Sequence, residues 1–301
     1  MPLAFNRALD FAYGVPDRLS PLVRRVIARN PSPFTFHGTG TYIVGRGRVA
    51  VIDPGPELAD HVDALIAALD AGEEVSHIIV THTHVDHSPA ARALKQRTGA
   101  PTYGFGRHGG GLGDAPVEAG ADRDFVPDVA LADGATIAGE GWTLGAVHTP
   151  GHTSNHLCFA LAEEGALFPG DHVMGWSTTV VSPPDGDMAH YLASLARLEA
   201  RADRLYYPTH GAPIPEPRAY VGALAAHRQV RDHQIARALA GGVDTIPALV
   251  AAIYTRLDPR LTAAAGRSVL AHLIQMVAEG RAACVGEGPP GPESRFRPAG
   301  S

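Results

Sequence analysis

A short run of histidine and aspartate holds the densest reactive chemistry in the sequence. It reads His82-Thr-His84-Val-Asp86-His87 and comes just after a short predicted strand at residues 76–80. Neutral imidazole and carboxylate are ligands that suit Zn²⁺, Mn²⁺ or Fe²⁺. His82 and His84 can point the same way from a tight loop, while Asp86 and His87 can face a second centre. The run therefore predicts a metal site, and a solvated polar loop is the alternative.

Three later turns each place one further metal-competent residue after a predicted strand. His152 stands in Thr-Pro-Gly-His-Thr, Asp171 in Phe-Pro-Gly-Asp-His and His210 in Tyr-Pro-Thr-His-Gly. Each turn is weak evidence alone, because such sequences form ordinary turns without a ligand. Their common placement after strands favours one shared site.

Strands and helices alternate through the first two thirds of the chain, which indicates an α/β layered architecture. Alternating or continuous β-branched runs predict strands at residues 41–45, 49–53, 76–80, 101–103, 129–131, 142–147, 157–160, 166–169 and 205–208. Apolar residues at helical spacing predict helices at residues 58–69, 90–97 and 188–201. Residues 1–33 are expected to form an extension with a short helix at 21–28, and residues 104–124 a surface loop.

The pattern changes near residue 217, where helices replace strands. Helices are predicted at residues 219–240 and 246–254, with one or two more within residues 260–278, followed by extended pieces at 281–285 and 294–297. That order is typical of a winged helix-turn-helix. We therefore divide the chain into residues 1–218 and a winged-helix-like domain of residues 219–301.

The ligand candidates, taken in order with Asp53 at the end of a strand, resemble the metallo-β-lactamase superfamily. The resemblance implies an αββα four-layer sandwich with a dinuclear metal site at one edge of two facing sheets. It also implies a first metal on His82, His84 and His152. The second metal would lie on Asp86, His87 and His210, with Asp171 as the bridge. This complete set favours a dinuclear hydrolase over the mononuclear sulfur dioxygenases of the same fold.

Longer motifs are similar to the β-lactamase-like protein 2 group, which carries a C-terminal winged helix. They comprise residues 38–42, 149–156 and 170–179, and the resemblance spans about residues 30–290. Asp53 is expected to be a buried carboxylate that orients the loop of residues 82–87. Five more residues are expected near the site, with ordinary packing as the alternative for each: His156, His172, Trp176, Thr178 and Thr179.

The function implied by this resemblance is hydrolysis with two divalent metal ions, zinc being favoured over manganese or iron. A metal-bridging hydroxide would attack a small ester, thioester or lactone. Asp86 and Asp171 would serve as proton relays as well as ligands.

Two other functions stay open. Animal members of the resembling group cut single-stranded RNA, so an endoribonuclease is the main alternative. Residues 1–221 carry 16 basic and 25 acidic residues, a balance that disfavours phosphate binding. A winged-helix DNA-binding regulator is the third hypothesis. This hypothesis is weakened because the predicted recognition helix is rich in Ala and Leu. The main polar side chains that it could present to DNA bases are Arg267, His272 and Gln275.

Composition bounds the remaining questions. The chain has 301 residues, a net charge of −6 and two cysteines, Cys158 and Cys284, too few for a disulfide framework. The start has no basic region followed by an apolar run, and no apolar stretch approaches 18 residues. We therefore expect a cytoplasmic protein without a membrane partner, with the winged helix covering the pocket or forming a homodimer contact.

Overall fold

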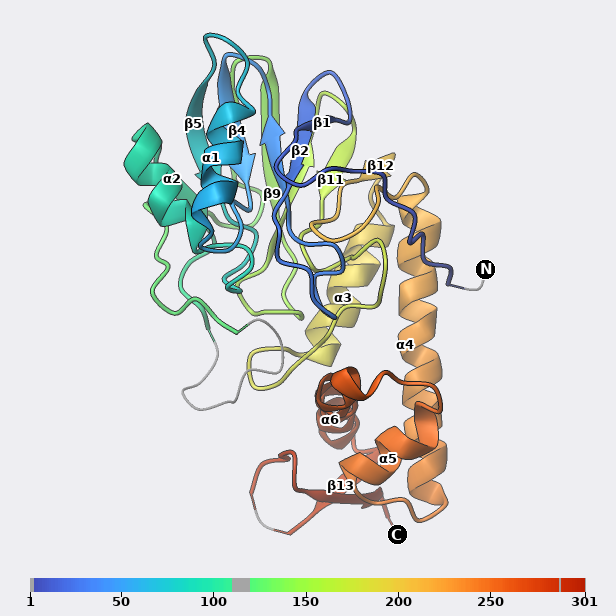
Figure 1. Cartoon of the computed structure of the whole chain (residues 1–301). Coiled ribbons are helices and arrows are strands. Elements are labelled where there is room, and N and C mark those ends of the chain that lie inside the picture. Colours follow the sequence, from blue (N-terminus) through green and yellow to red (C-terminus); the bar gives the residue numbers. More distant parts are fainter. Residues whose placement is uncertain (1–2, 110–119, 287, 301) are drawn as a thin grey trace.

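Two β-sheets form the centre of the molecule. The computed structural model describes residues 3–109, 120–286 and 288–300 (Figure 1). The first sheet has seven strands in sequential order: β1 (Asp17–Arg18), β2 (Val23–Ile27), β3 (Gly40–Val44), β4 (Arg48–Ile52), β5 (Glu74–Ile79), β6 (Thr102–Gly104) and β7 (Val129–Ala130). The second has five, in the order β12 (Leu205–Tyr206), β11 (Ala166–Phe168), β10 (Leu157–Leu161), β9 (Trp142–His148) and β8 (Thr136–Gly139).

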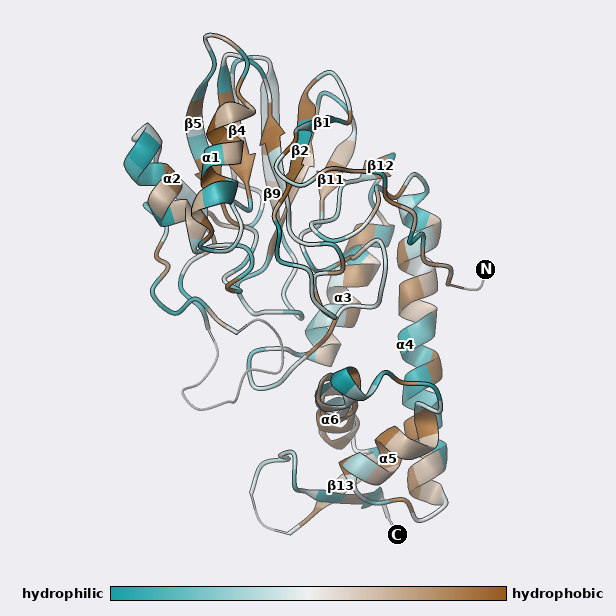
Figure 2. Cartoon of the chain, in the orientation of Figure 1, coloured by the Kyte–Doolittle hydropathy of each residue, from teal (hydrophilic) through white to brown (hydrophobic). Residues whose placement is uncertain are grey.

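Three apolar clusters hold four layers together. Tyr42 of β3 and Phe159 of β10 belong to the cluster between the two sheets. Helices α1 (Ala59–Ala67) and α2 (Ala90–Thr98) cover the outer face of the first sheet, where Ile43 is buried. Helix α3 (Met188–Glu199) and the start of α4 (Pro217–Ala240) cover the second sheet. The result is the αββα sandwich that the sequence predicts, and brown apolar strands mark its centre in Figure 2.

Helix α4 continues from the sandwich into the C-terminal domain. Its residues Val221 and Leu224 pack against the second sheet's helical layer, whereas Ile235 and Leu239 belong to a separate apolar cluster. That cluster also contains parts of α5 (Ile246–Ile253), α6 (Thr262–Ala278) and the antiparallel strands β13 (Ala282–Val285) and β14 (Arg295–Pro298). A 3₁₀ turn, Pro259–Leu261, precedes α6. The predicted division between residues 218 and 219 thus falls inside a helix that both parts share.

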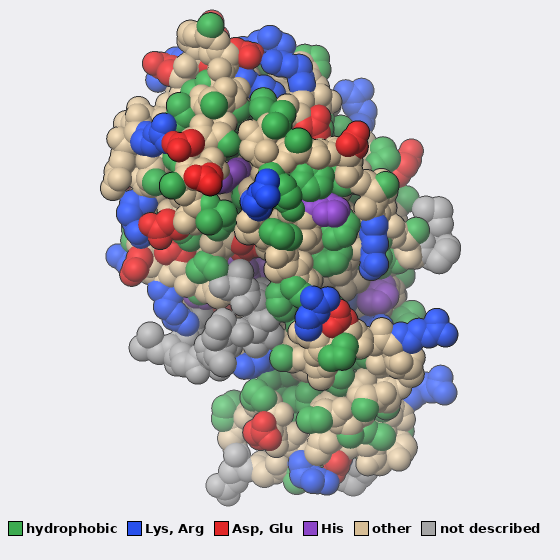
Figure 3. All heavy atoms as spheres, in the orientation of Figure 1, with side chains coloured by type: hydrophobic (Ala, Val, Ile, Leu, Met, Phe, Trp, Pro, Cys, Tyr) green, Lys and Arg blue, Asp and Glu red, His purple; other side chains and the backbone are tan. Residues whose placement is uncertain are grey.

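One stretch in the described part of the chain, Pro259–Ala278, is long and apolar enough to cross a membrane. Half of it is buried inside the molecule, as expected of the core helix of a folded domain. The visible face of the surface carries acidic and basic side chains interspersed (Figure 3).

The structure corrects two local expectations. The helix predicted at residues 21–28 is wrong, because residues Val23–Ile27 form the fully buried strand β2. Its two arginines are buried in ion pairs, Arg24 with Glu73 at 2.7 Å and Arg25 with Asp17 at 2.9 Å. The sequence of this strand therefore lacks the alternation of apolar and polar residues by which a strand is recognised. Strand β8 was not predicted. Of the predicted loop at 104–124, residues 110–119 lie outside the described residues.

Candidate metal centre

Four loops from both sheets meet at one edge of the sandwich. The loop after β5 carries His82, His84, Asp86 and His87. Single residues come from three other connections: His152 from the β9–β10 turn, Asp171 from the segment after β11, and His210 from the segment after β12. The structure therefore brings together all seven residues that the sequence predicts as metal ligands.

The seven side chains form two compact groups. In the first, the nitrogens of His82, His84 and His152 lie within 4.8 Å of one another. His84 Nδ1 is 3.0 Å from His82 Nε2 and 3.1 Å from His152 Nε2. The second group joins Asp86, His87, Asp171 and His210 within the same limit.

Asp171 lies between the two groups. Its Oδ2 atom is 3.4 Å from His87 Nε2 in the second group and 3.9 Å from His152 Nε2 in the first. Its Oδ1 atom is 3.5 Å from His210 Nε2. One carboxylate therefore faces ring nitrogens of both groups, which is the position that a bridging ligand requires.

Hydrogen bonds behind the rings direct a lone pair of each histidine toward the site. His87 Nδ1 donates to the Asp53 carboxylate at 2.9 Å, and His152 Nδ1 donates to the carbonyl of Val180 at 2.7 Å. His210 Nδ1 donates to the carbonyl of Gly38 at 3.1 Å. A neutral imidazole that donates from Nδ1 keeps a lone pair on Nε2. In all three rings, Nε2 is the atom that faces the groups.

The orientation of His82 follows from a relay of donors. The hydroxyl of Thr81 donates to Asp53 Oδ2 at 2.8 Å, so its oxygen is an acceptor for His82 Nδ1 at 3.1 Å. His82 Nε2 therefore also carries a lone pair. That lone pair faces His84 Nδ1 at 3.0 Å, and His152 Nε2 lies 3.1 Å from the same atom, so nitrogens of three rings converge as the ligands of one cation do.

Unpartnered buried atoms supply a test of whether metal ions fit here. His87 Nε2, His210 Nε2 and Asp171 Oδ1 are buried and make no hydrogen bond within the described part of the chain. Buried polar atoms in folded proteins nearly always have a partner. Imidazole nitrogen and carboxylate oxygen are suitable donors for divalent transition metals. The residues present thus fit a metal-binding role.

The carboxylate of Asp53 holds the ligand loops in place from behind the histidine rings. Its buried carboxylate accepts hydrogen bonds from the Thr81 N–H at 2.8 Å and from the Thr209 hydroxyl at 3.0 Å, besides those from the Thr81 hydroxyl and His87. Its own backbone is left-handed, with φ of 49°. The carboxylate thus connects the loops after β4, β5 and β12, in the orienting position that the sequence suggests.

Burial and charge act in opposite directions on the two groups. Burial and the neighbouring histidines lower the pKa of His84 to about 3. Burial also opposes protonation of His210, but the carboxylates of Asp171 and Asp86 outweigh it and raise its pKa to about 10. Although burial disfavours the charged carboxylate of Asp86, His87 and His210 lower its pKa to about 2. The carboxylates of the second group therefore stabilise positive charge beside them, as they would a bound cation.

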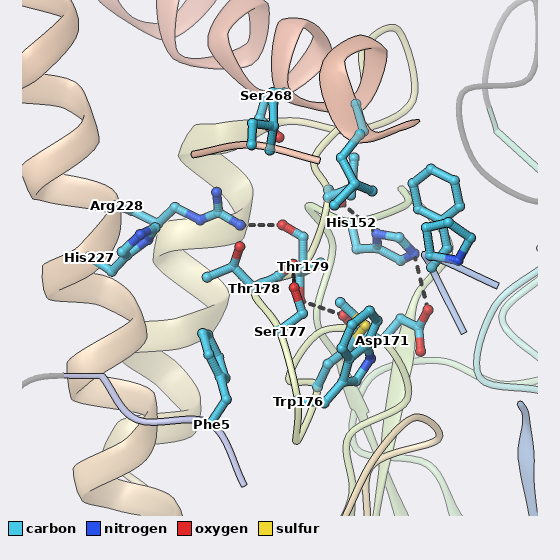
Figure 4. A pocket seen from close by; sticks show the side chains of 18 of the residues that line it. Phe5, His152, Asp171, Trp176, Ser177, Thr178, Thr179, His227, Arg228 and Ser268 are labelled. Atoms are coloured by element: carbon cyan, nitrogen blue, oxygen red, sulfur yellow. Dashed lines mark hydrogen bonds and ion pairs between the residues drawn. The ribbon is translucent and has the colours of Figure 1, made fainter. Parts of the chain in front are cut away.

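A cavity of about 210 Å³ opens onto this centre. Its wall on the metal side includes His84, Asp86, His152 and Asp171, and its opposite wall comes from α4 and α6 of the C-terminal domain (Figure 4). The winged-helix domain therefore covers the pocket, one of the two positions expected from the sequence. Trp176, Thr178 and Thr179 line the wall between, as predicted for part of the pocket.

Comparison with known proteins identifies the family. The family model described as the metallo-beta-lactamase superfamily matches residues 35–210, more than half of the chain. The chain belongs to the metallo-beta-lactamase superfamily. A second model, the beta-lactamase associated winged helix domain, matches residues 245–288. Both assignments agree with the predicted family and fold, and the prediction of an enzyme of this superfamily is confirmed.

Curated relatives of this superfamily member carry a more specific description. An atrochrysone carboxyl ACP thioesterase from Cryptosporiopsis is 33% identical over 225 residues, which cover 74% of this chain and 64% of that protein. The chain thus matches slightly less than two thirds of that relative. An atrochrysone carboxyl ACP thioesterase from Aspergillus novofumigatus is 31% identical over 87% of this chain and 80% of its own length.

Solved structures show the same fold. A beta-lactamase domain protein from Burkholderia ambifaria aligns with a TM-score of 0.79 over 96% of this chain and 94% of its own, at 24% identity. A metallo-beta-lactamase family protein from Thermus thermophilus aligns with a TM-score of 0.72 over 93% of this chain and 99% of its own, also at 24% identity. Both cover the sandwich and the C-terminal domain of this superfamily member.

The remaining predicted histidines lie behind the superfamily site and do not line the cavity. His156 is fully buried, its ring centre is 5.1 Å from that of His82, and its Nδ1 atom is 2.9 Å from the Thr149 hydroxyl. His172 is also fully buried and packs on Tyr191 at 4.6 Å. Both rings therefore pack beneath the ligand loops, where burial lowers the pKa of His172 to about 3.

Gly151 sets the position of His152 by its lack of a side chain. Its φ is +138°, and a Cβ atom there would lie 2.3 Å from the Cα of Tyr191. Real Cβ atoms do not approach backbone so closely, so α3 and the turn would have to separate. We expect Gly151→Ala to lower the free energy of unfolding by about 2–4 kcal/mol. Urea denaturation measures this. Gly72→Ala, at an open left-handed turn with nothing within 4 Å, is the control for φ strain alone.

Sequence reasoning missed several residues that line the cavity. Phe5, Phe34, His227, Arg228 and Arg231 all contribute to its wall. They come from the first 34 residues and from α4, outside the ligand motifs of the superfamily. Their spacing carries no signal for this role, because only the packing of α4 across the site brings them to it.

Proposed function

We propose that the protein is a dinuclear metal-dependent hydrolase that cleaves thioesters of small acyl groups. The position of Asp171 between two groups of converging ligand atoms is the observation that carries the dinuclear part. The thioester part is supported by the relatives in Cryptosporiopsis and Aspergillus novofumigatus, which are named as atrochrysone carboxyl ACP thioesterases. Esters and lactones have similar carbonyl chemistry and are the nearest alternatives.

The two groups define which residues would hold each ion. His82, His84 and His152 would hold the first, Asp86, His87 and His210 the second, and Asp171 would contact both. When bound, two divalent ions supply Lewis acidity and a water of near-neutral pKa. Zinc suits an imidazole-rich set best, with manganese and iron as alternatives.

The protein's own residues position the substrate and move the proton. In the reaction, a water oxygen forms a bond to the thioester carbonyl carbon and the carbon–sulfur bond breaks, which gives a carboxylic acid and a thiol. Asp86 and Asp171 line the cavity, and their charged carboxylates accept the proton that the attacking water loses and pass it to the sulfur of the leaving thiolate. Burial disfavours the charged form of Asp171, but His210 and His87 outweigh it and hold its pKa well below its usual range.

Apolar side chains hold the acyl group next to these carboxylates. The ring of Trp176 stacks on Phe36 at 4.8 Å, which fixes this side of the wall, and Met174 and Phe34 extend the apolar surface. Such a wall excludes water from the acyl chain.

A substrate panel combined with metal analysis tests the proposal. We expect close to two metal ions per chain by elemental mass spectrometry. We also expect kcat/KM for an N-acetylcysteamine thioester to exceed that for the matched oxygen ester and for a lactone. The panel includes a single-stranded RNA oligomer. Cleavage of RNA well above thioester hydrolysis would replace this proposal with the endoribonuclease alternative, and metal content below one would refute the dinuclear part.

A further inference from the structure

Two arginines of α4 enter the cavity opposite the metal centre. Arg228 is only 3% exposed, and Figure 4 shows its guanidinium reaching from α4 toward Thr179. Its Nη2 atom donates to the carbonyl of Thr179, while its Nε atom is buried without a hydrogen-bond partner in the described part of the chain. Arg231 follows one turn later and also lines the cavity.

Neither arginine has an acidic partner in the described part of the chain. Among the described residues, no carboxylate oxygen lies within 4.0 Å of a nitrogen of Arg228 or Arg231. Asp232, the neighbouring acid on α4, is already paired with Arg281 at 2.8 Å. Because arginine does not lose its proton in proteins, the positive charge at Arg228 remains buried without a counter-ion. A buried, unpaired charge is costly, and a bound anion offsets that cost.

The surroundings hold these groups in place without neutralising them. Arg231 lies over the ring of Tyr254 at 4.2 Å, and its Nη1 atom donates to Gln234 Oε1 at 2.7 Å. Its Nε atom is buried and unpartnered in the described structure, as is the Nδ1 atom of His227. The two arginines therefore have donor capacity left next to the same cavity, and the unpartnered His227 nitrogen lies on the same side of α4.

The cavity thus has two chemically different ends. The metal centre forms one end, Arg228 and Arg231 form the other, and apolar residues line much of the wall between them, beside Ser177, Thr178 and Thr179. The apolar residues are Phe5, Phe34, Met174, Trp176, Leu257 and Leu261. A ligand that matches this order has an electrophilic carbonyl, a short apolar stretch and an anionic group.

We propose that Arg228 and Arg231 form a subsite for an anionic group of the substrate, a carboxylate or a phosphate. This inference rests on the proposed thioester hydrolysis and narrows its substrate class. The anion would be either a carboxylate at the far end of the acyl chain or the phosphate of the carrier arm. Arg228 is already fixed by Thr179, so little side-chain freedom is lost when an anion binds.

Two matched substrate pairs distinguish the sources of the anion. The first pair is a series of N-acetylcysteamine thioesters of short dicarboxylic acids and their terminal carboxamides, which differ only in charge. The second pair is a hexanoyl thioester of phosphopantetheine and of pantetheine. We expect kcat/KM to favour the anionic member of one pair by about 10- to 100-fold, because hydrogen bonds between charged groups are strong.

Variants connect this preference to the arginines. Arg231→Gln is expected to reduce the preference for the anionic member by about 10-fold or more, mainly through KM. Arg237→Gln makes the same change at an exposed position of α4 and should leave the preference as in the wild type. Arg228→Lys keeps the charge but loses the planar fork, and is expected to retain part of the preference.

Equilibrium binding separates this proposal from the proposed activity. Binding of adipic acid monoamide and of inorganic phosphate to the metal-loaded protein is followed by the fluorescence of Trp176 in the cavity wall. At least one of these two anions should bind more weakly to the Arg231→Gln variant than to the Arg237→Gln variant. If no thioester is hydrolysed but this difference is present, the activity is wrong and the anion subsite stands. The subsite is refuted if neither substrate pair shows a preference and neither anion binds. It is also refuted if the substrate preference and the anion binding both remain unchanged in Arg231→Gln and Arg228→Gln.

Discussion

Replacement of Asp171 by alanine is expected to abolish metal binding at full stoichiometry and activity together. Asp171 is the one described carboxylate that faces ring nitrogens of both groups, at 3.4 Å from His87 and 3.9 Å from His152. Its loss removes a ligand from each ion and negative charge from the second group. We expect metal content to fall from about two ions per chain to one or fewer, and kcat/KM to fall by at least about 1000-fold.

The matched control is Asp60→Ala, at an exposed position in the first turn of α1. It removes the same carboxylate far from the site and should leave metal content and kcat/KM within about twofold of the wild type. Elemental mass spectrometry and thioester kinetics on the same preparations give both readouts. Two tightly bound ions in active Asp171→Ala protein would mean that this carboxylate is not the bridge.

The seven ligand candidates could be predicted because chemistry and sequence order coincide in them. His82, His84, Asp86 and His87 lie within six residues of sequence, and His152, Asp171 and His210 each follow a strand that is apolar enough to identify. Parallel and antiparallel strands of two facing sheets deliver such turns to one edge. Residue types and their order along the chain therefore predict which residues form the site, but they do not predict the distances between those residues.

What the sequence could not provide depends on tertiary packing. The carbonyls of Gly38 and Val180 orient His210 and His152, but a backbone oxygen has no residue type by which to find it. Arg228 and Arg231 occupy a helix whose apolar and polar residues give no clear face. Only the docking of α4 across the second sheet brings them to the cavity. Strand β2 was predicted as a helix for a related reason. Its two arginines are buried because acidic residues elsewhere in the chain, Glu73 and Asp17, pair with them.

Asp53→Asn is expected to weaken both the fold and the metal site, although Asp53 contacts no substrate. The carboxylate accepts four hydrogen bonds, from the N–H and hydroxyl of Thr81, the hydroxyl of Thr209 and the ring of His87. An amide places an NH₂ donor against one of these donors. It also removes the acceptor that fixes the tautomer of His87. We expect a loss of about 3–5 kcal/mol in the free energy of unfolding and a 10- to 100-fold weaker affinity for metal, about the cost of losing a partner of a ligating histidine.

Thr209→Val separates the general cost of a lost hydrogen bond from the specific role of the carboxylate. It removes one of the four donors while the bond between His87 and Asp53 remains, so stability should fall by only about 1–2 kcal/mol with metal affinity nearly unchanged. Urea denaturation of metal-free protein measures the first quantity, and competition with a chelator measures the second. Because Asp53 lies behind the rings and outside the cavity, excess metal should restore most of the kcat of Asp53→Asn. If kcat stays low in fully metal-loaded Asp53→Asn protein, the carboxylate acts in the reaction itself and not only by holding the ligand loops.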